Sequence, residues 1–489
     1  MWPDNRAMSA AHASFRFDNS FFREMSGFYA EAVPQHAPAP RLLRLNEALA
    51  EELGASALIG APGDELAALF SGNAGFDGAA PLAQAYAGHQ FGGFSPSLGD
   101  GRALLLGEVI DAQGIRRDIA FKGSGRTPYS RGGDGKAAVG PMLREYLIGE
   151  ALHALGVPST RALAVVATGE PVRRERMLPG AVLTRVAASH LRVGTLQYFA
   201  ARGELEKLKQ IADYAIARHD PQLVGTPYIE WLKAVADRQA RLVAQWMGLG
   251  FIHGVMNTDN VALSGESIDF GPCAFMEAYS PEAVFSSIDH GGRYAYGNQP
   301  AIVQWNLARL AEALLPLMGG EDALEAARGV IEDFAAVYER HWLGVMRGKL
   351  GLAGEQADDL QLAEDWLTLL HGADADFTRS WRALADVAEG REEHLAAQLG
   401  EGWAAWRQRW QARCTASGAA LRGVNPLYVP RNHLVEAALA AASDEQDISV
   451  FERLLGALQQ PFEERPCLQD LAEPASSGFN EGYRTFCGT

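Results

Sequence analysis

The sequence predicts an α+β fold of two lobes, in which a small lobe of short strands and a helix precedes a larger, mainly helical lobe. Short apolar runs divided by turn signals dominate the first 195 residues, and helical periodicity dominates the rest. The length of 489 residues is enough for one large or two medium cores. We therefore expect one domain over residues 1–195, including an N-terminal extension, and a second over residues 196–489, including a C-terminal extension.

Apolar alternation and turn residues locate the elements of the first lobe. A turn at 111–114 separates two expected strands, and Pro141, a favourable first-turn residue, begins the expected long helix. The stretch 86–93 is too rich in glycine for a regular element. The expected helices cover 46–53, 64–70 and 141–155, and the expected strands cover 103–110, 117–122, 162–167 and 181–186.

Helical spacing of apolar residues locates the elements of the second lobe. The expected helices cover 205–218, 228–249, 302–317 and 434–442. Residues 465–489 carry proline, serine and glycine and are expected to form an irregular tail.

Composition excludes several classes of protein. The net charge of -17 and the pI of about 5.2 argue against a dominant nucleic-acid or anionic-membrane surface, although they permit a local cationic pocket. No apolar run approaches the roughly 20 residues of a membrane helix, and the first residues lack the layout of a signal peptide. We expect a cytoplasmic protein that acts as a monomer and binds neither nucleic acid nor membrane.

The four cysteines predict no metal cage. They form no C-x-x-C pair and no zinc-ligand spacing, so buried or incidental thiols are the simple interpretation. Two of them stand at notable positions: Cys273 follows an Asp-Phe-Gly sequence and Cys487 is third from the end.

The most informative segment is 253–260, which is followed by Asp269-Phe270-Gly271. Its layout is that of a protein-kinase active site, where a loop of type H-R-D-x-x-x-x-N precedes a metal-binding D-F-G. The third position, where a kinase has its catalytic aspartate, is Val255, which cannot accept a proton. Asp259 is the nearest carboxylate able to replace that base. The alternative is that Asp259 and Asn260 simply close a turn.

The same segment offers metal ligands. Mg²⁺ and Mn²⁺ prefer hard oxygen donors and commonly bridge protein carboxylates to nucleotide phosphates. The amide oxygen of Asn260 and the carboxylate of Asp269 suit that role, unless Asp269 only caps a turn.

Lys122 ends an expected strand, as the phosphate-binding lysine of a kinase does. A kinase holds that lysine through an ion pair with a helix glutamate, and the expected helix offers Glu145 and Glu150. Glu145 is the better candidate because it lies near the middle of the helix. Without the loop 253–260, solvated surface charge would be the better interpretation of this pair.

Three further groups are candidates for nucleotide contacts. Gly99, Gly101 and Arg102 precede the first expected strand, where a glycine-rich phosphate loop belongs, although a plain turn fits equally well. Asp134 and Gly135 lie in a loop that could fold over a nucleotide. Arg185 and Arg192 could bind phosphate with two hydrogen bonds each, but surface ion pairs are the simpler interpretation. His89 and His253 are expected to be structural.

Taken together, these segments resemble the selenoprotein O family of protein-kinase-like proteins, and the likeness runs from about residue 15 to the end. The matching segments are 17–19, 86–92, 98–103, 122–131, 134–135, 143–146, 253–271 and 431–434. The resemblance implies a kinase-like fold in which ATP binds in a flipped orientation. It also implies that AMP is transferred to Ser, Thr or Tyr hydroxyls of proteins.

The resemblance assigns a role to each candidate residue. It implies that Lys122, paired with Glu145, binds phosphate and that Asp259 accepts the proton, with Asn260 and Asp269 holding Mg²⁺ or Mn²⁺. The residues implied to contact ATP are Gly99, Gly101, Arg102, Lys122, Asp134, Gly135, Arg185, Arg192 and Asp269. It thus favours nucleotide binding over surface ion pairs for the two arginines.

This chain departs from the family pattern at one position. Some bacterial members resemble a redox-gated form, with a disulfide between a C-terminal cysteine and one in the loop well after the D-F-G. This chain has Phe285 at the matching loop position. Cys273 is an alternative partner for Cys487.

We therefore expect a protein adenylyltransferase that uses ATP with Mg²⁺ or Mn²⁺ and modifies protein hydroxyls. Two alternatives remain open. The first is a kinase-like phosphotransferase, with UMP transfer as a variant of it. The second is a non-enzymatic nucleotide-binding scaffold, which Val255 suggests because it cannot act as a base. The retained lysine, glutamate and metal ligands argue against the scaffold.

Overall fold

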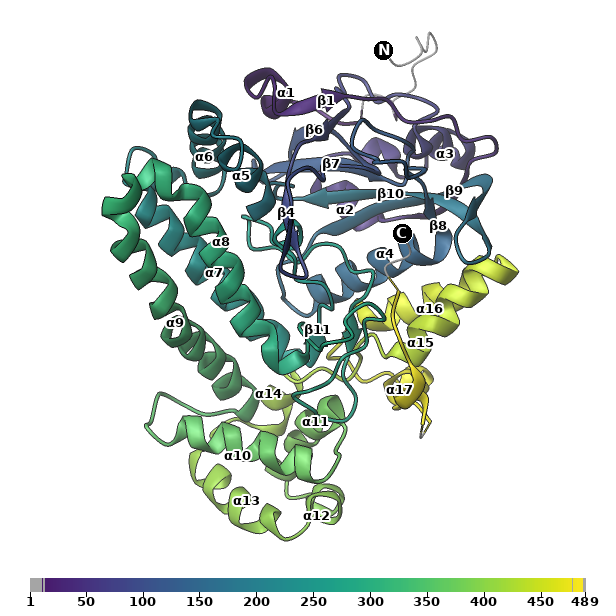
Figure 1. Cartoon of the computed structure of the whole chain (residues 1–489). Helices are drawn as coiled ribbons and strands as arrows, with labels where there is room; N and C mark the ends of the chain where they lie inside the picture. Colours follow the sequence, from purple (N-terminus) through teal and green to yellow (C-terminus); the bar gives the residue numbers. More distant parts are fainter. Residues whose placement is uncertain (1–10, 12–13, 477, 487–489) are drawn as a thin grey trace.

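The computed structural model describes residues 11, 14–476 and 478–486. The structure combines an antiparallel sheet with many helices, most of which lie outside the sheet, as expected of the α+β class (Figure 1). The main sheet lies at the upper right in Figure 1, and helices α7 (Tyr228–Leu249), α8 (Gln299–Met318) and α9 (Leu324–Leu350) lie to its left and slope toward the lower middle. None of the helices in the described part of the chain combines the length and apolar character that a bilayer crossing needs.

The main sheet is antiparallel, with the strand order β1-β3-β6-β7-β10-β9-β2 and with β8 paired to β10. Its strands are β1 (Tyr29–Glu31), β2 (Arg41–Leu45), β3 (Leu82–Gln84), β6 (Ala103–Ile110), β7 (Arg116–Lys122), β8 (Ala137–Ala138), β9 (Arg161–Arg173) and β10 (Met177–Ala187). Successive side chains of a strand point to opposite faces. Val182 accordingly packs in one core and Leu183 in another.

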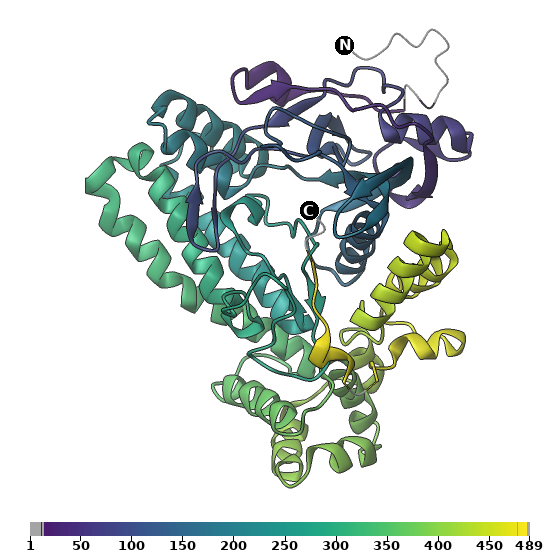
Figure 2. The ribbon, with the colours of Figure 1, turned by 45° about the vertical axis from the view of Figure 1, so that its right-hand side comes forward.

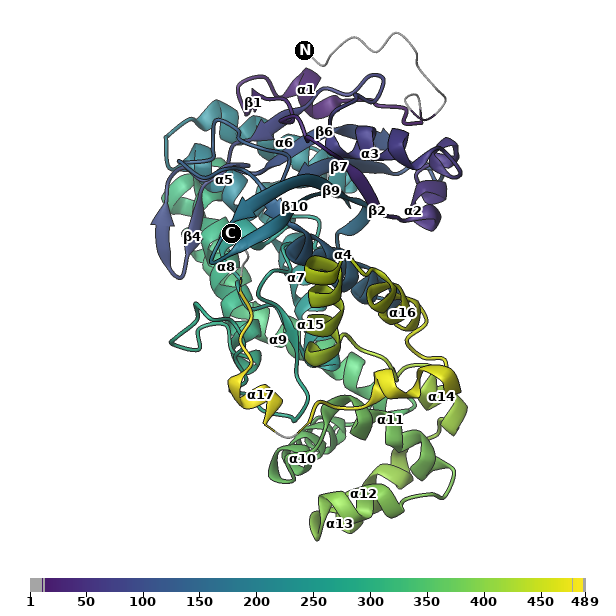
Figure 3. The ribbon, with the colours of Figure 1, turned by 90° about the vertical axis from the view of Figure 1, so that its right-hand side faces the viewer.

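Helices cover both faces of this sheet. On one face lie α2 (Glu47–Glu52) and α3 (Gly63–Ser71), and on the other lies α4 (Val139–Ala154). The short helices α15 (Asn432–Ala440) and α16 (Ser449–Leu458) pack beneath α4, as Figure 3 shows. Because α4 lies between the sheet and these helices, nearly all of its residues are buried, including the charged Arg144, Glu145 and Glu150. Its position is therefore fixed from both sides.

The helical part has one large core shared by α5 (Val193–Ala200), α6 (Leu205–His219), α7, α8 and α9. Below it, α10 (Asp359–Gly372), α11 (Phe377–Ala388), α12 (Glu393–Leu399), α13 (Gly402–Arg413) and α14 (Gly418–Arg422) form the lower end of Figure 1. The core of this end is a tryptophan cluster made of Trp366, Trp381, Trp403, Trp406 and Trp410.

The final segment returns to the middle of the molecule. After α17 (Phe479–Gly482), the chain runs upward between the sheet and the helices, shown in yellow in Figure 2. Thr485 pairs there with Ser286 in a parallel bridge, and its hydroxyl donates to the carbonyl oxygen of Pro272 at 2.6 Å. The segment is thus held against the loop that follows Asp269.

Several sequence predictions are confirmed and others are wrong. The expected strand 103–110 and the expected helix 228–249 match β6 and α7 residue for residue. The stretch 86–93 is not irregular, because β4 (Gly88–Gln90) and β5 (Gly93–Ser95) form a hairpin there. The expected strands 162–167 and 181–186 are too short, since they belong to the long pair β9 and β10. The C-terminal tail is only partly irregular, because it contains α17.

Candidate active site

A cavity of about 1770 Å³ lies between the sheet and the helical part. Every site residue expected from the sequence lines it. These are Gly99, Gly101, Arg102, Lys122, Asp134, Gly135, Glu145, Arg185, Arg192, Asp259, Asn260 and Asp269. Residues separated by as many as 170 positions in the chain are therefore brought to one place.

The charge of the cavity differs from that of the chain. Ten basic and eight acidic side chains line it, whereas the whole chain carries a net charge of -17. A concave site with an excess of positive charge attracts anions and concentrates them locally. The cavity is therefore suited to an anionic ligand in a protein that is otherwise acidic.

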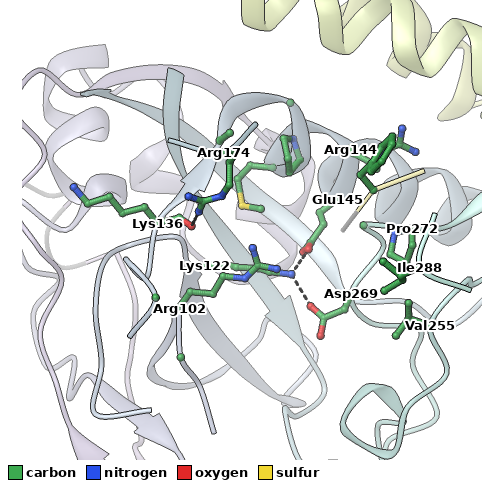
Figure 4. A pocket seen from close by; sticks show the side chains of 18 of the residues that line it. Arg102, Lys122, Lys136, Arg144, Glu145, Arg174, Val255, Asp269, Pro272 and Ile288 are labelled. Carbon is green, nitrogen blue, oxygen red and sulfur yellow. Dashed lines mark hydrogen bonds and ion pairs between the residues drawn. The ribbon is translucent and has the colours of Figure 1, made fainter. Parts of the chain in front are cut away.

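Lys122 stands at the end of β7 and points across the cavity toward α4 and the loop containing Asp269 (Figure 4). Its ammonium group contacts Glu145 Oε1, and Nζ lies 2.6 Å from Asp269 Oδ1. The side chains of Lys122 and Glu145 are only 6% and 5% exposed. A buried charge pair of this kind is fixed in place because separating it would leave an uncompensated charge.

Asp269 is the meeting point of the basic side chains. Besides Lys122, its Oδ1 accepts a hydrogen bond from Arg185 Nη1 at 2.8 Å, and Arg192 Nη1 lies 3.9 Å from its Oδ2. Burial alone would raise the pKa of this carboxyl, but these three cations hold it well below its usual range. Asp269 also has a φ of 65°, a left-handed conformation that few residues other than glycine adopt. The loop therefore maintains a charged aspartate in a strained conformation.

Asp259 lies in the short helical turn Thr258–Asn260 and is 8% exposed. Its Oδ2 accepts a hydrogen bond from Gln90 Nε2 at 3.2 Å, while Oδ1 has no hydrogen-bond partner among the described residues. Burial raises the pKa of its carboxyl to about 6. A side chain of this kind is still mostly ionised near neutral pH and can accept a proton.

The close approach of Gly88 shapes the surroundings of Asp259. A Cβ atom at Gly88 would lie 2.5 Å from Asp259 Oδ1, so any larger residue would displace the carboxylate. Arg192 donates from Nη1 to the backbone oxygen of Asp259 at 3.0 Å. Val255, in the position of a kinase base, is 5% exposed and lines the cavity.

The loop that carries Asp134 and Gly135 also lines the cavity. Asp134 forms a salt bridge with Arg174 at 2.8 Å, which holds its pKa below the usual range. Gly135 has a φ of 69°, and a Cβ atom there would lie 2.1 Å from the backbone oxygen of Gly125. Only glycine fits this position, which fixes the loop that carries Asp134.

Asn260 and Asp269 provide an amide oxygen and a carboxylate, which are the donors that Mg²⁺ and Mn²⁺ accept. Asn260 Nδ2 donates to the backbone oxygen of Val255 at 3.0 Å, a bond that uses the amide nitrogen and not the oxygen. Within the described residues, no cluster of three or more His, Cys, Asp or Glu side chains could hold a metal by itself. The two side chains are thus of a kind that a divalent cation accepts as ligands.

Sequence reasoning missed three polar residues that support the site. Gln90 bonds Asp259, the ring of Tyr86 lies 4.4 Å from the guanidinium carbon of Arg192, and His190 contacts both arginines. Tyr86 and Gln90 belong to the glycine-rich stretch 86–93, which overlaps a segment of the family resemblance but carries no recognisable catalytic motif. The two histidines expected to be structural do make structural contacts: His89 with Gln197 and His253 with the backbone oxygen of Ile268.

The described residues give no support to a thiol switch. Cys273 is buried, and burial raises the pKa of its thiol to about 12, so it is not ionised at neutral pH. Phe285 packs its ring against Tyr483 at 5.8 Å and accepts a backbone hydrogen bond from Thr485. The bridge between Cys273 and Cys487 stays untested, because Cys487 lies outside the described residues.

Comparison with known proteins adds an independent finding. The family model described as protein adenylyltransferase SelO matches residues 12–459. The protein nucleotidyltransferase YdiU of Chromobacterium violaceum is 61% identical over 475 residues, which cover 94% of this chain and 99% of that protein. The proteins of the same name from Cereibacter sphaeroides and Rhizobium meliloti are 60% and 54% identical, and each match covers 97% of this chain and all of the relative.

Proposed function

This chain belongs to the protein adenylyltransferase SelO family and is a nucleotidyltransferase, and on that premise we propose that it transfers AMP from ATP to Ser, Thr or Tyr hydroxyls of proteins. Pyrophosphate is the leaving group in this proposal. The ATP is a substrate, and Mg²⁺ or Mn²⁺ accompanies it.

The observation that carries the proposal is the set of cations around Asp269. Lys122, Arg185 and Arg192 all lie within 3.9 Å of its carboxylate. In addition, Nη2 of Arg192 is buried and has no hydrogen-bond partner among the described residues. A buried donor without a partner is costly, and a phosphate oxygen would satisfy it. Three cations that face only two carboxylates, Asp269 and Glu145, together with the unpaired donor of Arg192 therefore support a site that receives a triphosphate.

Asp259 is the proton acceptor in this proposal. The acceptor hydroxyl oxygen forms a bond to the α-phosphorus, its proton passes to the Asp259 carboxylate, and the bond between the α-phosphorus and the bridging oxygen breaks. Lys122, Arg185 and Arg192 offset the negative charge of the phosphates and of the departing pyrophosphate. Such preorganised charges supply most of the catalysis in phosphoryl-transfer enzymes.

Asn260 and Asp269 would hold the metal ion, which supplies further charge compensation at the phosphates. Lys122 and Arg185 occupy the Asp269 carboxylate in the structure. For Asp269 to take a metal ion, these two side chains have to turn toward the phosphates. The proposal therefore couples ATP binding to a rearrangement of one ion-pair network.

The same proposal covers the wider organisation of the chain. We assign the sheet with α4 to the smaller lobe of a kinase-like fold and the helices from α5 onward to the larger lobe, with a boundary near residue 195. The lysine on β7, the glutamate on α4 and the Asp269 loop support this assignment, because they hold the kinase order and meet in one cavity. A monomer acting in the cytoplasm is part of the proposal.

Transfer of label from ATP to an acceptor protein tests the proposal. Purified chain is incubated with Mg²⁺ or Mn²⁺, an acceptor such as casein, and ATP carrying ³²P at either the α- or the γ-position. Label that reaches protein from the α-position alone supports AMP transfer. Label from the γ-position alone indicates a phosphotransferase, which the retained Lys122–Glu145 pair would also permit. Metal-independent nucleotide binding without any labelling of acceptor or chain would instead favour a scaffold.

A further inference from the structure

His190 lies behind the cavity wall, in the segment between β10 and α5. It is 3% exposed and does not line the cavity. Its ring nevertheless accepts a hydrogen bond from Arg185, and its backbone oxygen accepts one from Arg192. Both arginines face the Asp269 carboxylate. A residue with this placement can act on a ligand only through the arginines.

Asp118 on β7 holds both the backbone nitrogen and the ring of His190. Its Oδ2 accepts from the backbone nitrogen of His190 at 2.8 Å and lies 2.9 Å from the ring Nδ1. Arg218 on α6 holds the other carboxylate oxygen at 2.5 Å. Although burial alone would raise the pKa of Asp118, Arg218 and His190 lower it to about 2. Asp118 is therefore an ionised acceptor.

The other side of His190 holds the two arginines. Arg185 Nε donates to His190 Nε2 at 3.2 Å, and the same guanidinium reaches Asp269 through Nη1 at 2.8 Å. Arg192 Nε donates to the backbone oxygen of His190 at 3.1 Å, and its Nη1 bonds the backbone oxygen of Asp259. One residue thus sets the position of both guanidinium groups.

These partners define the protonation state of the ring. A carboxylate can only accept, so Nδ1 must carry the proton that Asp118 receives. An arginine Nε always donates, so Nε2 must present its lone pair. Only the neutral Nδ1–H tautomer satisfies both bonds, and burial, which lowers the pKa of His190, favours this neutral form. The assembly is a chain of hydrogen bonds that runs from Asp118 through His190 and Arg185 to Asp269.

We propose that His190 is a positioning residue whose neutral ring holds Arg185, and whose carbonyl oxygen holds Arg192, in the orientation that receives the phosphates of ATP. The inference rests on the proposed function for the identity of the ligand. It adds a residue that touches neither nucleotide nor acceptor. A supporting group that fixes the rotamer of a ligand-binding side chain commonly decides how well the site performs.

Two substitutions distinguish the hydrogen bond between the His190 ring and Asp118 from the one between the ring and Arg185. In His190→Asn the amide nitrogen can still donate to Asp118, but nothing reaches Arg185. In His190→Gln the longer side chain places an amide oxygen where Nε2 stood, so Arg185 keeps an acceptor. Both variants keep the backbone oxygen that Arg192 uses. The exposed His394, replaced by Asn, is the matched control.

We expect His190→Asn to weaken binding of a non-hydrolysable ATP analogue about tenfold and to raise the KM for ATP more than it lowers kcat. His190→Gln should recover most of this loss, and the melting temperatures of the parent and both variants should agree within a few degrees. In an Arg185→Ala background, His190→Asn should change analogue binding by less than about twofold, because its effect passes through Arg185.

The proposal is overturned if His190→Asn binds the analogue as tightly as the parent, or if its loss is equally large in the Arg185→Ala background. Should His190→Asn fail to fold, folded His190→Gln decides: binding close to that of the parent supports the acceptor role, and a tenfold loss contradicts it. Analogue binding does not depend on which phosphate is transferred. Labelling from γ-³²P-ATP would therefore refute the proposed function while leaving the coupling of His190 to Arg185 intact.

Discussion

The charged side chains at the centre of the cavity wall and the rings of the tryptophan cluster are both buried, but different interactions hold the two groups together. The wall includes buried charged side chains, such as Lys122, Glu145 and Arg185, and it contains buried polar atoms that have no partner among the described residues. The cluster consists of indole rings, in which Trp406 stacks on Trp410 at 5.8 Å and on Trp403 at 5.7 Å. Burial of apolar rings stabilises a fold, whereas burial of charge is at best close to neutral.

The two regions therefore have different roles: the cavity wall binds a ligand and the tryptophan cluster stabilises the fold. Holding charged side chains away from water lowers the stability of the site but strengthens its interaction with a ligand. The tryptophan cluster lies far from the cavity and stabilises the fold. Substitutions in the cavity wall and in the tryptophan cluster should therefore affect activity and stability differently. A variant of the wall should lose activity with little loss of stability, and a variant of the cluster should do the reverse.

Trp406→Ala should show the largest effect on stability. Trp406 is 1% exposed, and its Nε1 donates to the backbone oxygen of Leu362 at 2.9 Å. Removing the ring leaves a cavity and an unpaired acceptor, so the free energy of unfolding should fall by about 3–5 kcal/mol. Urea denaturation measures this loss, and ATP turnover per folded molecule should remain that of the parent.

Trp406→Phe provides the control for this substitution. It keeps a ring in the cluster and should cost clearly less than Trp406→Ala. A loss of turnover that exceeds the loss of folded protein would show that the cluster and the cavity are coupled.

Lys122→Met should show the largest effect on activity, a reduction in kcat/KM of about 10²–10³-fold. The carboxylates of Glu145 and Asp269 keep Arg185 at 3.9 Å and 2.8 Å, so the free energy of unfolding should fall by less than in Trp406→Ala. Initial rates of label transfer and urea denaturation on the same preparation measure both quantities. A Lys122→Met protein with near-normal activity would remove the lysine from the proposed mechanism.

Acid should lower the free energy of unfolding through His219, whose ring Nε2 lies 2.7 Å from Ser189 Oγ, next to His190 in the chain. Burial, followed by the charges of Arg218 and Arg238, lowers the pKa of His219 from 6.5 to about 3, so the folded state holds this ring neutral. The unfolded chain binds the proton first, and stability is therefore lost as pH falls below about 6.5. At pH 5.5 this one group should cost about 1.4 kcal/mol.

Urea denaturation at pH 7.5 and pH 5.5 measures that slope. His219→Gln should reduce the difference between the two pH values, and the exposed His394→Gln should leave it unchanged. An unaltered slope in His219→Gln would mean that this histidine does not contribute to acid sensitivity.

Sequence alone predicted the elements that carry local signals. The strand 103–110 and the helix 228–249 have their own periodicity and turn residues, and they match β6 and α7. By contrast, β1 and β3 have three residues each and exist because Tyr29 pairs with Gln84, far away in the chain. No local pattern encodes such a pair.

The same distinction holds for the site. Lys122, Glu145, Asp259 and Asp269 stand in recognisable motifs and do line one cavity. His190 could not be found in this way, because its importance depends on Asp118, 72 positions earlier, and on the side chains of two arginines. Positioning residues of this kind become visible only in three dimensions.

The most direct measurement compares Asp259→Asn with the parent chain in both transfer of label from α-³²P-ATP and unfolding in urea. Asparagine has the same shape but cannot take up the proton, and it removes a carboxylate whose charge is disfavoured by burial. We expect label transfer to fall at least about 100-fold, while the free energy of unfolding stays the same or rises. Full label transfer by folded Asp259→Asn would contradict it.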